Sequence, residues 1–341
     1  MPRLFGRSLF SNAVQRRLLL AGAALACAAS AACGATGPAA PTALPTVRVV
    51  TLPATATVLA AASATTVAIA TVVPATLAPG VTPDASATLA PTLSVPAATE
   101  SQPTPDAQGA TRPVRLPILM YHYVEPWPAD ADEIRQGLTV RPEDFAAQMA
   151  YLHDHGYVTV SLYDLADAVA LGRPLPEKAL VLTFDDGYRS LVDQAVPVMK
   201  PYGYTGTVFV ITQLMDDELP AYLTWPQAEA LYAQGWKIEP HTKTHEELAG
   251  RDRDFQLYQM LGSIQTVQAH IGRQPRFLAY PSGKRDDLTL ALAGELNLWG
   301  AVTVDFGRVH RWQDRYEMTR VRVSGTAALS DFVNALEGDL P

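Results

Sequence analysis

From Val114 onward, short apolar runs alternate with longer amphipathic segments. The apolar runs have the length and composition of buried strands, and they occupy residues 116–121, 157–160, 179–184, 207–211, the surroundings of Ile238, 277–280, 301–304 and 319–323. The amphipathic segments predict helices at residues 143–153, 162–171, 189–202, 226–234 and 329–336. Seven or eight strands alternating with helices predict an α/β fold, an irregular parallel (β/α) barrel.

Residues that favour helix ends support this pattern. Ser161 and Thr224 stand where N-caps are expected, and Pro142 occupies the first position of its predicted helix. Gly172 and Gly203 follow the last apolar position of theirs, where a left-handed residue ends a helix without steric cost. The strand and helix boundaries in the second half of the chain are therefore well marked.

The first 33 residues have the pattern of an export signal. Four arginines precede the apolar run 18–32, which is too short for a comfortable membrane span. The run ends in Ala31-Ala32-Cys33-Gly34, which resembles a bacterial lipoprotein cleavage site, with Ser30 where a leucine is usual. Lipidation of Cys33 and simple secretion both remain open. We expect an extracellular or cell-surface protein that contacts the membrane only through such an anchor.

Residues 34–113 have a different composition. Ala, Thr, Pro and Val dominate, charges are sparse, and no aromatic residue occurs between Phe10 and Tyr121. Without aromatic side chains there is little material for a core, and the prolines remove backbone donors. The segment is predicted to be a disordered tether. The folded domain is then expected to occupy residues 114–341, which is long enough for one substantial core.

Two adjacent acids, Asp185 and Asp186, follow the apolar strand 179–184 in the sequence TFDDG. Neighbouring carboxylates repel each other, unless one holds a cation and the other serves as a base. The sequence HTKTH at 241–245 follows another strand-like run, and histidines four residues apart share a face if they lie on a helical turn. Two imidazoles and one carboxylate with an open position form the ligand set of a catalytic zinc ion.

The two sequences TFDDG and HTKTH together resemble the polysaccharide deacetylase family, also called NodB-homology or carbohydrate esterase family four. The opening sequence PILMYH at 117–122 is similar to the branch that includes the poly-N-acetylglucosamine deacetylases. The resemblance covers residues 114–336 and leaves the tether out. It implies an enzyme that removes N-acetyl groups from a polysaccharide.

The resemblance also implies roles for individual residues. Asp186, His241 and His245 would hold a divalent metal ion, with zinc preferred and cobalt or nickel acceptable. Asp185 would be the general base and His122 the general acid.

A third motif, AYPSG at 279–283, would place Tyr280 and Ser282 near the substrate, where a backbone N–H near Ser282 would bind the oxyanion. Thr242 is expected to hold the histidine loop. His270 and His310 lack a partner motif and are predicted to lie at the surface.

One departure from the family pattern concerns the third motif. Many members carry an Arg that braces the base there, and this chain has Ala279 instead. Arg320, near the end of the last predicted strand, either replaces that Arg or pairs with a surface carboxylate. The missing Arg keeps a second hypothesis open, a weak or inactive cell-wall glycan-binding protein on the same fold.

The substrate and partners are left broad by the sequence. Poly-N-acetylglucosamine, peptidoglycan and chitin-like polymers are all compatible with the expected chemistry. A third hypothesis is an anchored structural protein whose metal ion only stabilises the domain. The formal net charge of −8 gives no general basic patch for nucleic acid.

Overall fold

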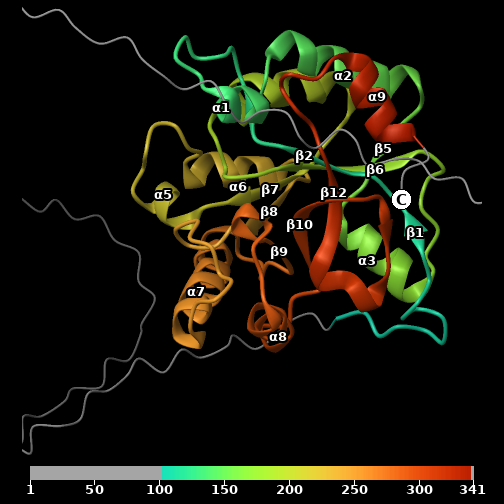
Figure 1. Cartoon of the computed structure of the whole chain (residues 1–341), viewed down its shortest axis with the longest axis vertical. Coiled ribbons are helices and arrows are strands. Elements are labelled where there is room, and N and C mark those ends of the chain that lie inside the picture. The colour runs from blue at the N-terminus through green and yellow to red at the C-terminus, as the bar shows by residue number, and fades with distance from the viewer. Residues whose placement is uncertain (1–101, 339–341) are drawn as a thin grey trace, which may run out of the picture. The chain divides into compact units, whose positions relative to one another are not determined.

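The computed structural model describes residues 102–338, which fold around one parallel sheet (Figure 1). The strands follow one another across the sheet in the order β8 (Lys237–Pro240), β7 (Thr207–Val210), β6 (Ala179–Phe184), β2 (Ile118–Tyr121), β12 (Met318–Arg322), β10 (Gly300–Phe306) and β9 (Phe277–Ala279), while β5 (Val158–Thr159) pairs with β6 beside this path. Two small pairs stand apart, β1 (Val114–Arg115) with β11 (Val309–His310) and β3 (Tyr123–Val124) with β4 (Thr139–Val140). The predicted export signal, Cys33 and the tether up to residue 101 lie outside the described residues.

The sheet curves until its two edge strands, β8 and β9, face each other across a seam. No backbone hydrogen bonds pair β8 with β9 in the described sheet, and side-chain hydrogen bonds connect the two strands instead. Glu239 on β8 accepts hydrogen bonds from the backbone N–H groups of Arg276 and Phe277, both at 2.9 Å. The result is a nearly closed parallel barrel of seven strands, with β5 outside the ring, which confirms the predicted irregular (β/α) barrel.

Helices connect most of the strands. They are α1 (Glu133–Leu138), α2 (Pro142–Asp154), α3 (Leu162–Leu171), α4 (Val196–Met199), α5 (Thr212–Asp216), α6 (Trp225–Ala233), α7 (Arg253–Ile271), α8 (Asp287–Glu295) and α9 (Leu329–Glu337). Helix α3 has the predicted bounds, with a capping box at Ser161 and Gly172 in the left-handed region. The segment predicted as one helix from 189 to 202 is instead a π-helical turn, α4 and a short 3₁₀ turn. Pro197 and Pro201 explain this irregularity, because neither can donate a backbone hydrogen bond.

Strand residues alternate between two apolar clusters, as the pleat of a strand requires. Ile118 and Val181 point to the face that packs on α3, whereas Leu119 and Leu182 point to the opposite face. Helices α2, α6 and α9 cover that opposite face, and α2 and α9 lie side by side in Figure 1. A third cluster joins the outer side of β9 and β10 to α7 and α8. Both faces of the sheet are therefore buried, as is usual for parallel strands.

Residues 102–113, which the sequence analysis places in the tether, contact the barrel. The backbone N–H of Asp106 donates to the carbonyl of Ala170 at the end of α3, 3.0 Å away. Asp106 also forms a salt bridge of 2.6 Å with Arg112. The chain is thus held against the domain before its first strand begins.

His270 and His310 were both predicted to lie at the surface, and only one of them does. His270 is exposed and stacks on Trp225 with 4.0 Å between ring centroids. His310 is only 2% exposed, so its predicted surface position is wrong. Its Nε2 contacts the carbonyl oxygen of Leu116 at 2.9 Å, because the pairing of β1 with β11 brings these two segments together.

Within residues 102–338, no helix is both long and apolar enough to cross a membrane.

Candidate metal centre and active site

Asp186, His241 and His245 converge at the carboxyl ends of β6 and β8. The Nε2 atoms of His241 and His245 lie 3.4 and 3.3 Å from Oδ1 of Asp186. One ligand atom from each residue lies within 4.8 Å of the others. Strand ends of a barrel meet at one rim, which is why two motifs separated by about 55 residues share a site.

A hydrogen bond across the seam orients His241. Its Nδ1 lies 2.8 Å from the carbonyl oxygen of Ala279 on β9. A carbonyl only accepts, so Nδ1 carries the proton and Nε2 presents its lone pair to the space beside Asp186. Such a bond to the far nitrogen is typical of histidines that bind metal ions.

The two histidines do not lie on a helical turn, contrary to the sequence expectation. Residues 241–245 form a loop in which Thr242 and His245 adopt left-handed backbone conformations, with φ of 62° and 64°. The Thr242 hydroxyl accepts from the His245 N–H at 3.1 Å, so Thr242 holds the loop. Two left-handed residues turn the chain back on itself, and this turn brings the imidazoles together without a helix.

The three residues fit a divalent metal ion. Asp186 is 6% exposed, and its Oδ1 has no hydrogen-bond partner among the described residues. A buried, unpartnered carboxylate oxygen between two imidazole Nε2 atoms is well placed to share a cation with them, which would offset its desolvation. Two histidines and a carboxylate form a known catalytic zinc set, and imidazole also suits cobalt and nickel.

Asp185 faces the interior of the barrel and pairs with Arg320 of β12. The guanidinium donates two parallel hydrogen bonds of 2.8 and 2.7 Å to the two carboxylate oxygens. Arg320 is fully buried, and its Nε donates to the carbonyl of Thr303 at 2.7 Å. Of the two alternatives for Arg320, the structure shows the pairing with the site aspartate and not with a surface carboxylate.

Burial and neighbouring charges shift the pKa values of Asp185 and His122. Burial alone would raise the pKa of Asp185, but the charge and hydrogen bonds of Arg320 outweigh it and hold the pKa well below its ordinary value. His122 follows β2, and its Nε2 lies 3.9 Å from Oδ2 of Asp185. Burial lowers the pKa of His122, although the Asp185 charge opposes this shift.

Comparison with known proteins decides the family. The family model described as "Polysaccharide deacetylase" matches residues 172–300. YxkH of Bacillus subtilis (strain 168), whose name places it among the polysaccharide deacetylases, is 32% identical over 213 residues, which are 62% of this chain and 73% of YxkH. The chain belongs to the polysaccharide deacetylase family.

Two further proteins are similar to this polysaccharide deacetylase family chain. The poly-beta-1,6-N-acetyl-D-glucosamine N-deacetylase of Staphylococcus epidermidis (strain RP62A) is 25% identical over 206 residues, covering 55% of this chain and 69% of that protein. The Streptococcus pyogenes deacetylase PplD, solved in complex with acetate, superposes with a TM-score of 0.62 at 28% identity. That superposition covers 66% of this chain and all of PplD.

The third motif of this deacetylase-family chain does not bring both of its predicted residues to the rim. The side chain of Tyr280 is 1% exposed and packs in the cluster between β9, α7 and α8. Because side chains alternate along a strand, Ala279 faces the barrel interior and Tyr280 faces the outer helices. Ser282 is exposed after β9, with a left-handed φ of 54°.

Two residues that support the site have no signal in the sequence. Gln259 of α7 is 1% exposed, and its carbonyl oxygen accepts from the N–H groups of Lys243 and Thr244. Glu239 joins the seam beside His241, and Tyr163 of α3 donates to it at 2.7 Å. Neither lies in a recognisable motif, since each acts through contacts with a distant segment.

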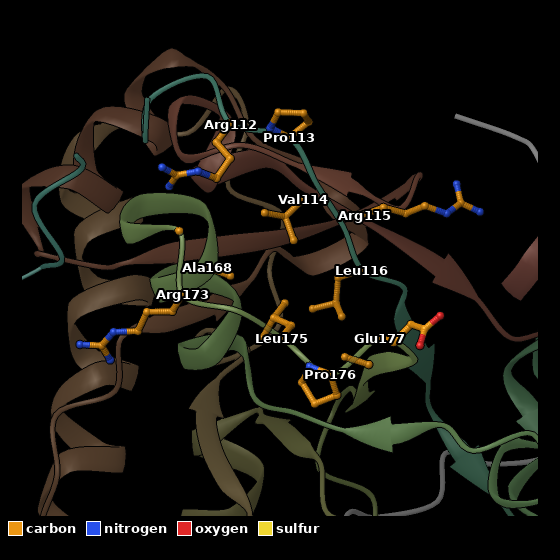
Figure 2. Close-up of a pocket in the computed structure, with 12 residues that line it drawn as sticks. Arg112, Pro113, Val114, Arg115, Leu116, Ala168, Arg173, Leu175, Pro176 and Glu177 are labelled. Atoms are coloured by element: carbon orange, nitrogen blue, oxygen red, sulfur yellow. The ribbon is translucent and has the colours of Figure 1, made fainter. Parts of the chain in front are cut away.

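A cavity of about 390 Å³ lies away from this rim, at the amino ends of β2 and β6. Figure 2 shows Val114, Leu116, Leu175 and Pro176 gathered at its centre, with the guanidinium groups of Arg112 and Arg173 turned away from them. The cavity contains none of the candidate metal ligands. In parallel barrels, chemistry belongs to the opposite end.

Proposed function

We propose that this protein is an exported, metal-dependent hydrolase that removes N-acetyl groups from a polysaccharide containing N-acetylglucosamine. One observation carries the proposal. Oδ1 of Asp186 lies within 3.4 Å of two imidazole Nε2 atoms, and the adjacent Asp185 is a separate, Arg-paired carboxylate. In this arrangement Asp186 would bind the cation and Asp185 would transfer the proton.

The metal ligands in this proposal are Asp186, His241 and His245, and zinc is the preferred ion. A divalent ion supplies Lewis-acid chemistry there, since it withdraws electron density from oxygen and makes water a better nucleophile. The residues around it do the rest. Arg320 keeps Asp185 ionised, so that its carboxylate is ready to accept the proton that water loses.

Hydrolysis of the acetamide forms a bond between the water oxygen and the carbonyl carbon and breaks the bond between that carbon and nitrogen. His122 is positioned beside Asp185 to give a proton to the departing nitrogen. Burial lowers the pKa of His122, so the proposal relies on the neighbouring Asp185 charge to favour the imidazolium form that gives up this proton. The products are acetate and a glucosamine unit. A backbone N–H near Ser282 is proposed to bind the developing oxyanion.

The family and the activity named for the staphylococcal relative support poly-β-1,6-N-acetylglucosamine as the first substrate to test. Peptidoglycan and chitin-like polymers stay within the proposal. The weak or inactive glycan-binding alternative arose from the Arg missing in the third motif. Because Arg320 braces Asp185 from β12, the structural evidence favours the enzyme.

The proposal is tested by acetate release from three probes: β-1,6-linked N-acetylglucosamine oligomers, chitin oligomers and peptidoglycan fragments. We expect zinc-dependent release by the wild-type protein, and loss of both zinc binding and release in Asp186→Ala. Asp254→Ala, which removes an exposed carboxylate on α7, is the matched control and keeps both. Zinc binding is measured separately by calorimetry after chelation. Full acetate release by Asp186→Ala would exclude the proposed metal site, and glycan binding without release under zinc, cobalt or nickel would favour the binding protein.

A further inference from the structure

The histidine loop, residues 241–245, has a costly backbone conformation. Thr242 and His245 both lie in the left-handed region, although neither is glycine. Residues with a Cβ atom adopt this conformation at a cost in free energy, and it persists only where the surroundings fix it. The hydrogen bonds that fix this loop therefore decide whether the two histidines can meet Asp186.

Gln259 of α7 supplies the acceptor for the turn. Its side chain is 1% exposed, and its Oε1 accepts from the backbone N–H groups of Lys243 and Thr244 at 3.1 and 3.0 Å. Both groups are donors, so the carbonyl oxygen of the amide and not its NH₂ group must face them. The NH₂ group donates to the Thr244 hydroxyl at 2.6 Å. One buried side chain thus makes three hydrogen bonds to the residues between the histidines.

The other side of the histidine loop is held by the start of α5. The backbone N–H groups of Thr212 and Gln213 donate to the carbonyl oxygens of Thr242 and Lys243, at 3.4 and 2.9 Å. The loop therefore lies between two helices, with N–H groups bonded to α7 and carbonyl groups bonded to α5. The contacts with α5 join backbone to backbone, whereas those with α7 depend on the side chain of Gln259.

The two histidines differ in what orients them. The ring of His241 is fixed by the bond from its Nδ1 to the Ala279 carbonyl. The ring of His245 has no comparable bond within residues 102–338, and its side chain is 37% exposed. Its Nε2 nevertheless lies 3.3 Å from Oδ1 of Asp186. The backbone of the histidine loop is therefore what places His245 beside the carboxylate.

We propose that Gln259 is a positioning residue for the metal ion, because it holds the histidine loop in the turn that brings His245 to Asp186. The inference rests on the proposed function, since it takes the two histidines and Asp186 as the metal ligands. It goes further by assigning part of the affinity for the divalent ion to a side chain that is not a ligand. Removing a partner of this kind commonly weakens metal binding by about 10–100-fold.

The test compares zinc affinity, measured by calorimetry after chelation, in two variants of α7. Gln259→Met fills a similar volume without the three hydrogen bonds, and we expect the zinc Kd to rise about tenfold or more. Gln256→Met is the matched control. Gln256 lies one turn earlier and is equally buried, but it bonds to Arg251, Asp286 and Thr289 instead of the histidine loop. Its zinc Kd should stay at the wild-type value.

Melting temperatures of the metal-free proteins separate positioning from a general loss of stability. Both methionine variants lose buried hydrogen bonds, so both should melt a few degrees below wild type. Only Gln259→Met should also lose zinc affinity. If Gln259→Met does not fold, Gln259→Asn takes its place, since it withdraws the acceptor by one methylene group.

A rescue variant tests the acceptor oxygen itself. Gln259→Glu keeps an oxygen for both N–H groups, and the Thr244 hydroxyl can rotate to donate to the second oxygen. We expect its zinc affinity to lie within about threefold of wild type. A loss as large as that in Gln259→Met would overturn the assignment to the acceptor.

Unchanged zinc affinity in the folded Gln259 variant, or an equal loss in Gln256→Met, also overturns the inference. Absence of zinc binding by the wild-type protein rejects the proposed metal site and this inference with it. The expected pattern of zinc affinities without any acetate release supports the positioning role and rejects the proposed hydrolase alone.

Discussion

At the scale of single residues, the buried ion pair between Arg320 and Asp185 holds the pKa of Asp185 below its ordinary value. Both groups are almost fully buried, and the guanidinium satisfies both carboxylate oxygens at once. Breaking a buried ion pair from one side leaves the other charge uncompensated, which costs much more than a surface pair is worth. The site is therefore most sensitive to changes at this pair.

We expect Arg320→Met to destabilise the domain by about 3–5 kcal/mol, because Asp185 is left as a lone buried charge. Misplacing Asp185, the proposed base, should also lower kcat/KM about a hundredfold. Denaturant unfolding and acetate release measure the two effects. Arg253→Met breaks an exposed salt bridge to Glu295 and serves as the control, with little change in either. Wild-type stability in Arg320→Met would contradict this view of the pair.

At the scale of elements, the seam between β8 and β9 depends on side chains. Glu239 supplies the acceptor that a neighbouring strand would otherwise provide, and it is 2% exposed. The bond from His241 to Ala279 crosses the same seam one layer higher. A change at Glu239 is therefore expected to loosen β9 and, through Ala279, the orientation of the proposed metal ligand His241.

Glu239→Ala removes the acceptor of two buried N–H groups, and we expect it to lower stability by about 1–3 kcal/mol. Glu239→Gln keeps an acceptor oxygen and should restore most of that loss. Zinc affinity is the second readout and should fall in the alanine variant alone. Glu229→Ala, at an exposed position of α6, is the control. Equal zinc affinity in the alanine variant and wild type would limit Glu239 to a structural role.

At the scale of the whole molecule, His310 ties the β1–β11 pair to the start of the barrel. Burial lowers the pKa of His310 to about 4, from an ordinary value of 6.5, so the folded protein keeps it neutral. The unfolded chain binds a proton on this group between those values, and the folded chain does not. Stability from this residue is therefore present above pH 6.5 and is lost as the pH falls toward 4.

We expect the neutrality of His310 to make the domain lose about 3 kcal/mol between pH 7 and pH 4, beyond what other groups contribute. His310→Gln keeps a donor for the Leu116 carbonyl and removes the titration, so its stability should decline less over that range. Urea unfolding at several pH values measures the difference. His153→Gln, at an exposed position, should follow the wild-type curve. Parallel curves for wild type and His310→Gln would refute the assignment.

The organisation of the whole chain leads to a proposal about the cellular location of the protein. With residues 1–33 as an export signal and 34–113 as a tether, the catalytic domain would act outside the membrane, anchored at Cys33 or free. The contacts of residues 102–113 would then mark where the tether meets the domain. Labelling with a lipid precursor, compared between wild type and Cys33→Ala, separates anchored from secreted protein.

The sequence by itself determined the alternation of strands and helices and the two motifs that follow β6 and β8. The elements depend on local properties, namely the periodicity of apolar residues and capping residues such as Ser161. The two motifs could be placed together because parallel strands of a barrel end at one rim. Helix α3 could be predicted to the residue for this reason.

Only the tertiary structure decided how the site is assembled. The support of the histidine loop by Gln259, the brace from Arg320 and the buried place of His310 each depend on a partner far away in the sequence. The same holds for Tyr280, whose strand parity turns its side chain to the outer helices. Local patterns specify which residues a segment buries, but the segment that meets them is set by packing of the whole barrel.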